Sequence, residues 1–215
     1  MLPLDQSATA KTRERYDRVA RFYDQMERGS ERRFGPMRAA LWSRVTGPRV
    51  LEAGVGTGKN MPSYPPGMAI TAIDLSPRML ERAEARAKRL NAAVTLQLAD
   101  VQALPFPDQS FDTVVATFVF CSVPDPVLGL AELRRTLTPG GQLLLLEHVL
   151  SRRPFLRLLM RLANPLAVRM AGANINRETV ANVERAGFVD LRVENRWLDI
   201  VKLIEARAPS AGSMA

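Results

Sequence analysis

The chain has 215 residues, and its 47% hydrophobic content is enough to bury the core of one domain. Its formal net charge is +8, and 26 of its 30 basic residues are arginine, which binds phosphate and carboxylate groups bidentately. A single cysteine excludes an intramolecular disulfide framework, and one histidine with one cysteine makes no metal-ligand cluster. No run of residues reaches the roughly 18 apolar residues of a transmembrane helix.

Residues 1–15 lack the apolar core of a signal peptide, so we expect a cytoplasmic protein. Helical patterns follow at residues 8–27 and 31–45, with a turn at Gly29-Ser30. From Arg49 onward, apolar runs alternate with helical patterns, which is typical of a parallel sheet covered on both faces. The predicted strands are residues 50–53, 69–73, 94–99, 113–118, 142–146, 189–193 and 198–205, and the helices between them are residues 77–90, 126–137 and 177–186. We therefore expect an α/β fold in one domain over residues 1–215, with a helical cap at 1–46, a catalytic core at 47–207 and a disordered tail at 208–215.

A glycine-rich loop, Gly54-Val55-Gly56-Thr57-Gly58, follows the first predicted strand, where the backbone passes close to a ligand and Cβ atoms would obstruct it. A dinucleotide-binding loop would have its third glycine at position 59, which is Lys59, so the spacing argues against NAD. Asp74 ends the second strand, where a carboxylate can accept hydrogen bonds from both ribose hydroxyls. Asp100 ends the third strand, on the adenine side of the same crevice.

This pattern resembles the class I S-adenosylmethionine-dependent methyltransferases over residues 49–206, and the stretches 104–112 and 137–141 are similar to that family as well. In the family, the glycine loop holds the methionine moiety, the acid after strand two binds ribose, and the acid after strand three lies at the adenine amino group. The resemblance implies S-adenosylmethionine as cofactor, S-adenosylhomocysteine as product, and a seven-stranded Rossmann-like sheet of order 3-2-1-4-5-7-6 with strand seven antiparallel. The residues it assigns to the cofactor are Tyr16, Tyr23, Glu52, Gly54, Gly56, Gly58, Asn60, Asp74, Leu75, Asp100, Val101 and Phe118.

Residues 16–24 have the sequence YDRVARFYD, which resembles the N-terminal segment of quinone and phospholipid methyltransferases. In those proteins such tyrosines cap the cofactor pocket. On a helix, Tyr16 and Tyr23 share one face with Met26, whereas the arginines lie elsewhere. Ordinary amphipathic packing of the helix would give the same pattern.

Residues 151–177 contain six arginines and no acidic residue. Arg153, Arg157 and Arg161 recur every four residues beside a broad apolar surface, so this segment can lie in an anionic membrane interface. A solvated helix that caps the core is the alternative. We expect an anionic membrane surface as partner, peripherally at the inner face of the cell membrane, and no nucleic acid, because the basic residues coincide with apolar faces. The polar-Pro-Pro-aromatic motif of amino-directed DNA methyltransferases is also absent after strand four.

The only histidine, His148, follows Glu147 at the end of the fifth predicted strand, at the lip of the predicted pocket. With the stretches 64–67, 120–124 and 174–177, it makes the chain similar to soluble bacterial phosphatidylethanolamine N-methyltransferases and their relatives that act on lipids, quinones or small thiols. The resemblance implies successive methylation of phosphatidylethanolamine toward phosphatidylcholine, and we expect a monomer without a metal. A quinone or other small-molecule methyltransferase, and a non-catalytic membrane-surface protein that binds the cofactor, remain alternatives. The candidate bases are His148 and Tyr23, and the candidate contacts to a headgroup phosphate are Arg153, Asn174 and Arg177.

Overall fold

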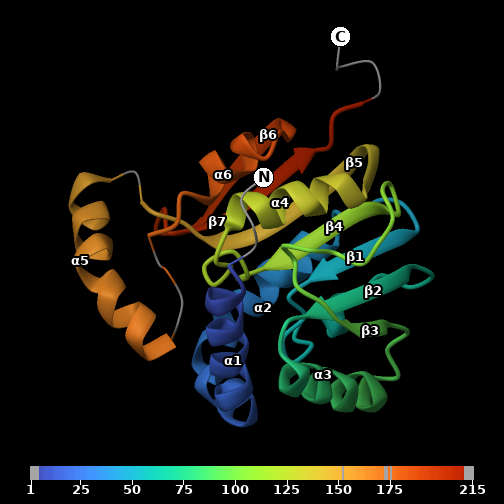
Figure 1. Ribbon diagram of the computed structural model, residues 1–215, viewed down its shortest axis with the longest axis horizontal. Coiled ribbons are helices and arrows are strands. Elements are labelled where there is room, and N and C mark those ends of the chain that lie inside the picture. Colours follow the sequence, from blue (N-terminus) through green and yellow to red (C-terminus); the bar gives the residue numbers. More distant parts are fainter. Residues whose placement is uncertain (1–4, 152, 172–173, 175, 211–215) are drawn as a thin grey trace.

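The computed structural model describes residues 5–151, 153–171, 174 and 176–210, without the side chains of residues 165–171. This part of the chain contains one seven-stranded sheet of order β3-β2-β1-β4-β5-β7-β6, as predicted (Figure 1). β1 to β5 are parallel, and β7 runs antiparallel to both β5 and β6. The strands are β1 (Arg49–Ala53), β2 (Ala69–Asp74), β3 (Thr95–Leu98), β4 (Phe111–Thr117), β5 (Leu137–His148), β6 (Val189–Trp197) and β7 (Val201–Arg207).

Local signals explain where the helices begin. Ser76 accepts a hydrogen bond from the amide of Met79 at the start of α3, and Asp125 caps α4 in the same way; both helices have proline in their first turn. The helices are α1 (Gln6–Met26), α2 (Arg28–Trp42), the short 3₁₀ helix η1 (Met61–Ser63), α3 (Pro77–Leu90), α4 (Pro126–Thr136), α5 (Pro154–Ala171) and α6 (Thr179–Arg185).

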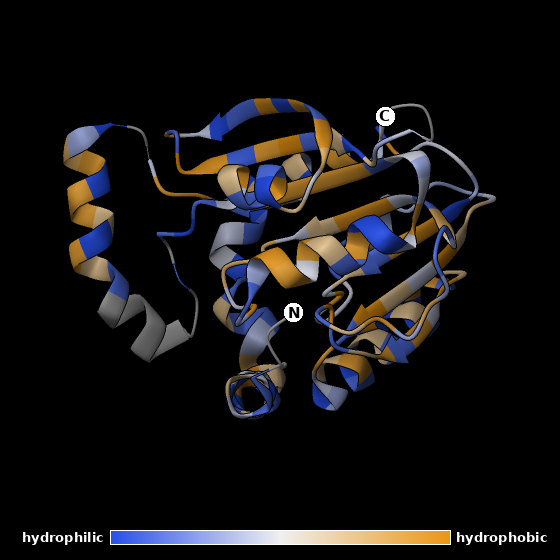
Figure 2. Ribbon diagram, turned by 45° about the horizontal axis from the view of Figure 1, so that its top comes forward, coloured by the Kyte–Doolittle hydropathy of each residue, from blue (hydrophilic) through white to orange (hydrophobic). Residues whose placement is uncertain are grey.

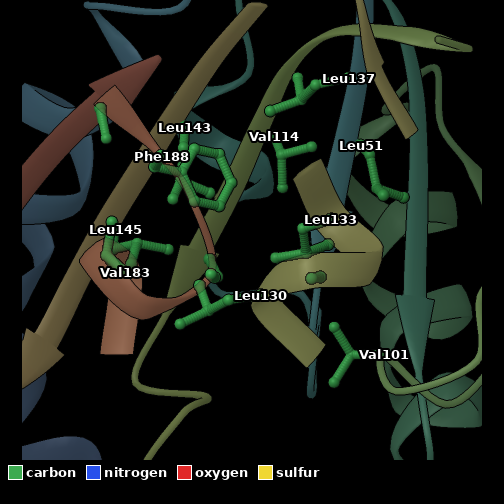
Figure 3. Close-up of a cluster of buried hydrophobic side chains, with 14 of the residues drawn as sticks. Leu51, Val101, Val114, Leu130, Leu133, Leu137, Leu143, Leu145, Val183 and Phe188 are labelled. Atoms are coloured by element: carbon green, nitrogen blue, oxygen red, sulfur yellow. The ribbon is translucent and has the colours of Figure 1, made fainter. Parts of the chain in front are cut away.

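Helices cover both faces of the sheet, which is why its central strands are apolar throughout. On one face, Leu130 and Leu133 of α4 and Val183 of α6 pack against Leu143 and Leu145 of β5 (Figure 3). On the other face, the buried residues Phe34, Leu41 and Trp42 of α2 pack against the alternate side chains of β5, and α3 packs beside them over β2 and β3.

Two helices lie outside these layers. α1 lies near the ends of the parallel strands and packs against α3, whereas α5 stands away from the sheet (Figure 1). Apolar and polar residues alternate along the part of α5 whose side chains are described (Figure 2). None of the helices in the described part of the chain has the length and apolar character needed to cross a bilayer.

Several predicted boundaries differ from those of the structure. α2 already begins at Arg28, so Gly29-Ser30 lies inside its first turn, where the Ser30 hydroxyl donates to the backbone carbonyl of Glu27. β5 begins at Leu137 rather than at residue 142, because its Pro-Gly-Gly stretch forms an irregular strand beside β4 instead of a turn. Positive φ angles at residues 198 and 199 delay β7 to Val201. At the predicted tail, Ala208 is buried and bonded to the backbone of β5, while residues 211–215 lie outside the described residues.

Candidate functional site

A cavity that is partly open to solvent lies at the carboxyl ends of β1 to β4, where open α/β sheets bind their ligands. α1 contributes Thr12, Tyr16 and Tyr23 to one wall. Of the residues assigned to the cofactor from the sequence, those that line the cavity are Tyr16, Tyr23, Gly54, Gly56, Asp74, Leu75, Asp100, Val101 and Phe118.

The glycine loop follows β1 and forms the floor of the cavity. Gly54 has a φ of +70° and Gly56 a φ of +55°, a region that glycine adopts without strain. A Cβ on Gly54 would collide with the side chain of Val119, whereas a Cβ on Gly56 would meet nothing within 4 Å. Because Gly56 lines the cavity, the open space above it is available to a ligand.

Asp74 joins the end of β2 to this loop. One of its carboxylate oxygens accepts a hydrogen bond from the Gly56 amide at 2.8 Å, and the other accepts one from the Ser76 amide at 2.9 Å. Burial raises the pKa of Asp74 to about 6, against the lowering effect of these amides. Each oxygen keeps a lone pair that can accept a ligand hydroxyl.

Asp100 occupies the corresponding place after β3. Its carboxylate accepts hydrogen bonds from the backbone amide and side chain of Gln102, and from the hydroxyl of Thr9 in α1 at 3.3 Å. Beside it, Val101, Leu75 and Met79 give the cavity an apolar end. This end can take a flat apolar ring, with the Asp100 carboxylate available at the rim.

Glu52, Gly58 and Asn60 are not among the residues that line the cavity. Glu52 is buried and accepts a hydrogen bond from the Asn60 amide at 2.6 Å and another from the Tyr64 hydroxyl. Burial raises the pKa of Glu52 to about 7. Arg38 of α2, which is also buried, donates to Asn60 and to Thr117. The network therefore supports the glycine loop from behind.

Hydrogen bonds tie α1 to the loops around the cavity. The hydroxyl of Ser76 donates to Asp17 at 2.5 Å, and the hydroxyl of Thr57 donates to Asp24 at 2.6 Å. Tyr16 shares a hydrogen bond with Ser122 in the loop after β4. The sequence pattern pointed to the two tyrosines of this segment but not to Asp17 and Asp24 beside them, although both aspartates belong to the repeated Tyr-Asp pairs.

The two candidate bases differ in position. Tyr23 lines the cavity, and burial raises its pKa, so its phenol stays protonated at neutral pH. His148 is not among the lining residues; its ring packs against Phe118 at 4.7 Å and against Phe34 at 5.7 Å between centroids. Burial lowers the pKa of His148, so its imidazole is neutral at pH 7.

The three candidate headgroup contacts lie around α5. Arg153 is exposed just before the helix. Asn174 contacts the loop after β4, since its backbone amide donates to the Cys121 carbonyl at 2.9 Å. The guanidinium of Arg177 donates to the Val123 carbonyl at 2.7 Å. Asn174 and Arg177 thus hold the loop that borders the cavity, a role that the sequence did not indicate.

Cys121 lies in the same loop. It is buried, and burial raises its pKa to about 12, so the thiol stays protonated. A protonated, buried thiol is a poor nucleophile. Among the described residues, no group of three or more histidine, cysteine or acidic side chains could hold a metal ion.

Comparison with known proteins identifies the family. Residues 51–145 match the model of a methyltransferase domain. Over 202 residues, which cover 88% of this chain and 82% of the relative, the chain is 31% identical to a thiol S-methyltransferase of Rattus norvegicus. The chain belongs to the S-adenosylmethionine-dependent methyltransferases. The methyltransferase is also 34% identical to a demethylmenaquinone methyltransferase of Tropheryma whipplei, over 77% of this chain and 72% of that protein.

A further relative matches a shorter stretch. The methyltransferase is 40% identical over 113 residues to a phosphatidylethanolamine N-methyltransferase of Cereibacter sphaeroides, which is 52% of this chain and 56% of that protein. The match thus spans about half the length of that relative. Among solved structures, phosphoethanolamine N-methyltransferase 2 of Haemonchus contortus in complex with S-adenosylmethionine shares the fold, with a TM-score of 0.71 and 19% identity over 93% of this chain and 60% of that one.

S-adenosylmethionine is the cofactor of this methyltransferase, and the cavity suits it. The acidic groups at the ends of β2 and β3 can accept hydrogen bonds from a nucleoside, and the apolar end beside Asp100 can take an adenine ring. The space above Gly56 leaves room for the methionine moiety beside the glycine loop.

Proposed function

We propose that this methyltransferase methylates the amino group of phosphatidylethanolamine in successive steps toward phosphatidylcholine, at the anionic inner surface of the cell membrane. The exposed apolar face of α5 is the observation that carries the proposal. Phe155 is 78% exposed and Leu162 is 71% exposed, and Leu158 and Leu159 are more than half exposed. The partial match to a phosphatidylethanolamine N-methyltransferase supports the same substrate.

The arrangement of charges on α5 suits an anionic interface. Arg153 and Arg161 are exposed beside the apolar residues, and Arg157 is partly exposed. Met160 is buried and faces the protein. A basic amphipathic helix of this kind can insert its apolar side chains at the headgroup boundary while its arginines meet lipid phosphates. We propose that the contact is peripheral and that the protein is otherwise cytoplasmic and monomeric.

The cofactor residues divide into two groups in this proposal. Asp74 would bind the ribose hydroxyls, and Asp100, with Leu75 and Val101, would hold the adenine. The methionine moiety would lie on the glycine loop, which Glu52 and Asn60 support from behind. The residues that would enclose the reacting centre are Tyr16, Tyr23 and Phe118.

The chemistry needs little from the protein except alignment and a route for one proton. The bound cofactor supplies an electrophilic methyl group on a sulfonium. The amine nitrogen must be neutral to attack this methyl group; as the N–C bond forms, the C–S bond breaks and its electron pair stays on sulfur. Tyr23, as a protonated phenol, would orient the amine. His148, as a neutral imidazole behind Phe118, would accept the proton through water.

We further propose that Arg153, Asn174 and Arg177 face the lipid headgroup. Arg153 is the exposed member of the three and would meet the phosphate at the start of α5. Asn174 and Arg177 would act mainly by holding the loop after β4 beside the headgroup, because their amide and guanidinium groups contact carbonyls of that loop.

The deciding experiment is transfer of radiolabelled methyl from S-adenosylmethionine to phosphatidylethanolamine in anionic vesicles, with the lipid products separated. Labelled mono-, di- or trimethylated lipid supports the proposal. No labelled lipid, with cofactor binding intact, contradicts it, and parallel assays with a demethylated quinone and a small thiol then test the acceptors named for the other relatives. Failure of all acceptors would favour a non-catalytic cofactor-binding protein.

The membrane contact has its own test. Replacing Arg153, Arg157 and Arg161 together with glutamine should weaken binding to anionic vesicles and leave binding to zwitterionic vesicles unchanged. A control with the same loss of charge replaces Arg82, Arg89 and Arg192, which are exposed on α3 and β6. Equal effects of the two triple variants would contradict a specific role of α5.

A further inference from the structure

The loop after β4, residues 118–124, borders the cavity and adopts an unfavourable backbone conformation. Phe118 has a φ of +58°, in the left-handed region that non-glycine residues rarely adopt. Phe118, Val119, Ser122, Val123 and Pro124 all line the cavity. Because such a conformation persists only where its surroundings hold it in place, some group must stabilise the start of this loop.

Glu147, the residue before the last of β5, is in position to do so. It is fully buried, and its Oε1 atom accepts hydrogen bonds from the backbone amides of Val119 at 2.8 Å and Phe120 at 3.1 Å. Successive amides that converge on one acceptor form a concave site that suits a negative charge. The second oxygen, Oε2, is also buried and has no hydrogen-bond partner in the part of the chain that the structure describes.

The contacts of the loop carry the effect of Glu147 to both sides of the cavity. The side chain of Val119 occupies the position that a Cβ on Gly54 would need, so it fixes the distance between this loop and the glycine loop. The ring of Phe118 packs against Phe34, at 4.9 Å, and against His148, at 4.7 Å between centroids. A shift of the amides at positions 119 and 120 would therefore displace the cofactor wall and the Phe118 ring together.

We infer that Glu147 is a positioning residue for methyl transfer: its carboxylate fixes the loop after β4 against the glycine loop and so sets the shape of the cofactor site. This role is separate from the identity of the methyl acceptor. It requires no contact between Glu147 and the cofactor, because Glu147 acts through Val119 and Phe118.

The charge of Glu147 gives this role a pH dependence. Burial raises its pKa to about 7, against the lowering effect of the positive charge on Arg38 of α2. The charge of Glu147 in turn raises the pKa of Cys121 in the loop. An ionised carboxylate accepts stronger hydrogen bonds from amides than a protonated one does. The loop is therefore held more firmly above pH 7 than below it, while Cys121 stays protonated throughout this range.

Glu147→Gln tests the inference because it keeps an oxygen acceptor and removes the charge. The dissociation constant of S-adenosylhomocysteine would be measured by calorimetry for the variant and the wild type. The ratio of the two constants should be near one at about pH 6, where Glu147 is protonated, and should rise about fivefold by about pH 8.5. Any titration of Asp74 is common to both proteins and cancels in the ratio. A ratio that does not change with pH contradicts the inference.

Two further variants separate positioning from general stability. Glu147→Leu removes the acceptor and should weaken cofactor binding at least about tenfold at every pH, with circular dichroism to verify the fold; a folded variant with wild-type affinity contradicts the inference. If this variant does not fold, the pH dependence of the glutamine variant still decides. Glu132→Gln is the matched control, because Glu132 also accepts a hydrogen bond from a backbone amide, that of Leu104 at 3.0 Å. Neither of these two residues lines the cavity. The ratio of the dissociation constants of Glu132→Gln and the wild type should stay near one at all pH values.

Discussion

Replacement of Asp74 with asparagine tests the proposed orientation of the cofactor. The two carboxylate oxygens of Asp74 accept hydrogen bonds from the backbone amides of Gly56 and Ser76, and they retain lone pairs for two ribose hydroxyls. Asparagine keeps the shape of the side chain but replaces one acceptor with a donor. A hydrogen bond to a charged group contributes about 1.5–3 kcal/mol, so losing one should weaken S-adenosylhomocysteine binding by about tenfold to hundredfold.

The pH dependence of binding adds a second signature of Asp74. Its pKa is raised to about 6 in the free protein, and the ribose hydroxyls would bind the ionised form. The dissociation constant of the wild type should therefore rise by up to about tenfold per pH unit below pH 6, as the carboxylate takes up a proton. The asparagine variant should lack this rise. Calorimetric titration with S-adenosylhomocysteine from about pH 5 to about pH 8 measures both effects.

Asp112→Asn is the control for this experiment. Asp112 also accepts a backbone amide, that of Arg49 at 3.0 Å, but it lies at the amino ends of β1 and β4, at the opposite edge of the sheet from the cavity. Its replacement should leave the dissociation constant unchanged. If folded Asp74→Asn bound S-adenosylhomocysteine as tightly as the wild type, Asp74 would not be the ribose ligand and the assigned orientation would be wrong.

Two other predictions concern the fold and the glycine loop. Gly54→Ala should lower both the melting temperature and the cofactor affinity, because the new Cβ collides with Val119. Gly56→Ala should reduce the affinity with a smaller loss of stability, because its Cβ meets nothing within 4 Å. Thermal unfolding with and without S-adenosylhomocysteine distinguishes the two variants, and equal losses of stability would contradict the prediction. Burial raises the pKa values of Glu52 and Glu147 to about 7, so the folded state binds protons more tightly than the unfolded state. The free energy of unfolding without cofactor should then fall by about 1–2 kcal/mol between about pH 6.5 and pH 8, and a rise in urea-unfolding experiments would refute this.

The features that could be predicted from the sequence are local ones. The glycine loop and the acids after β2 and β3 can be recognised because turn geometry and strand ends constrain those residues directly. The strand order, which the family resemblance implied, is the order that the structure shows. The start of β5 was missed because Pro139-Gly140-Gly141 is a typical turn sequence, and only pairing with distant residues such as Ala208 makes it part of a strand.

The supporting residues could not be predicted, because they act between segments that are distant in sequence. Arg38 lies 79 residues from Thr117, to which it donates, and Glu147 lies 28 residues from Val119. Arg38 belongs to no motif, and Glu147 was noted only as the neighbour of His148 at the end of a strand, with no spacing that would pair it with the loop after β4. His148 shows the opposite case: its position at a strand end suggested the lip of the pocket, but the Phe118 ring lies against it.

The cap formed by α1 connects these observations. Four side chains of α1 form hydrogen bonds with the loops after the first four strands: Thr9 with Asp100 after β3, Tyr16 with Ser122 after β4, Asp17 with Ser76 after β2, and Asp24 with Thr57 after β1. One helix therefore contacts the loop after each of these strands around the cavity. A cofactor that enters past α1 must break some of these contacts. The bond between Tyr16 and Ser122 contributes about 0.5–1.5 kcal/mol net, and each of the three bonds to a carboxylate contributes about 1.5–3 kcal/mol. The four sum to roughly 5–10 kcal/mol, which thermal motion can overcome during a catalytic cycle. The same helix can therefore exclude water during methyl transfer and still release the product.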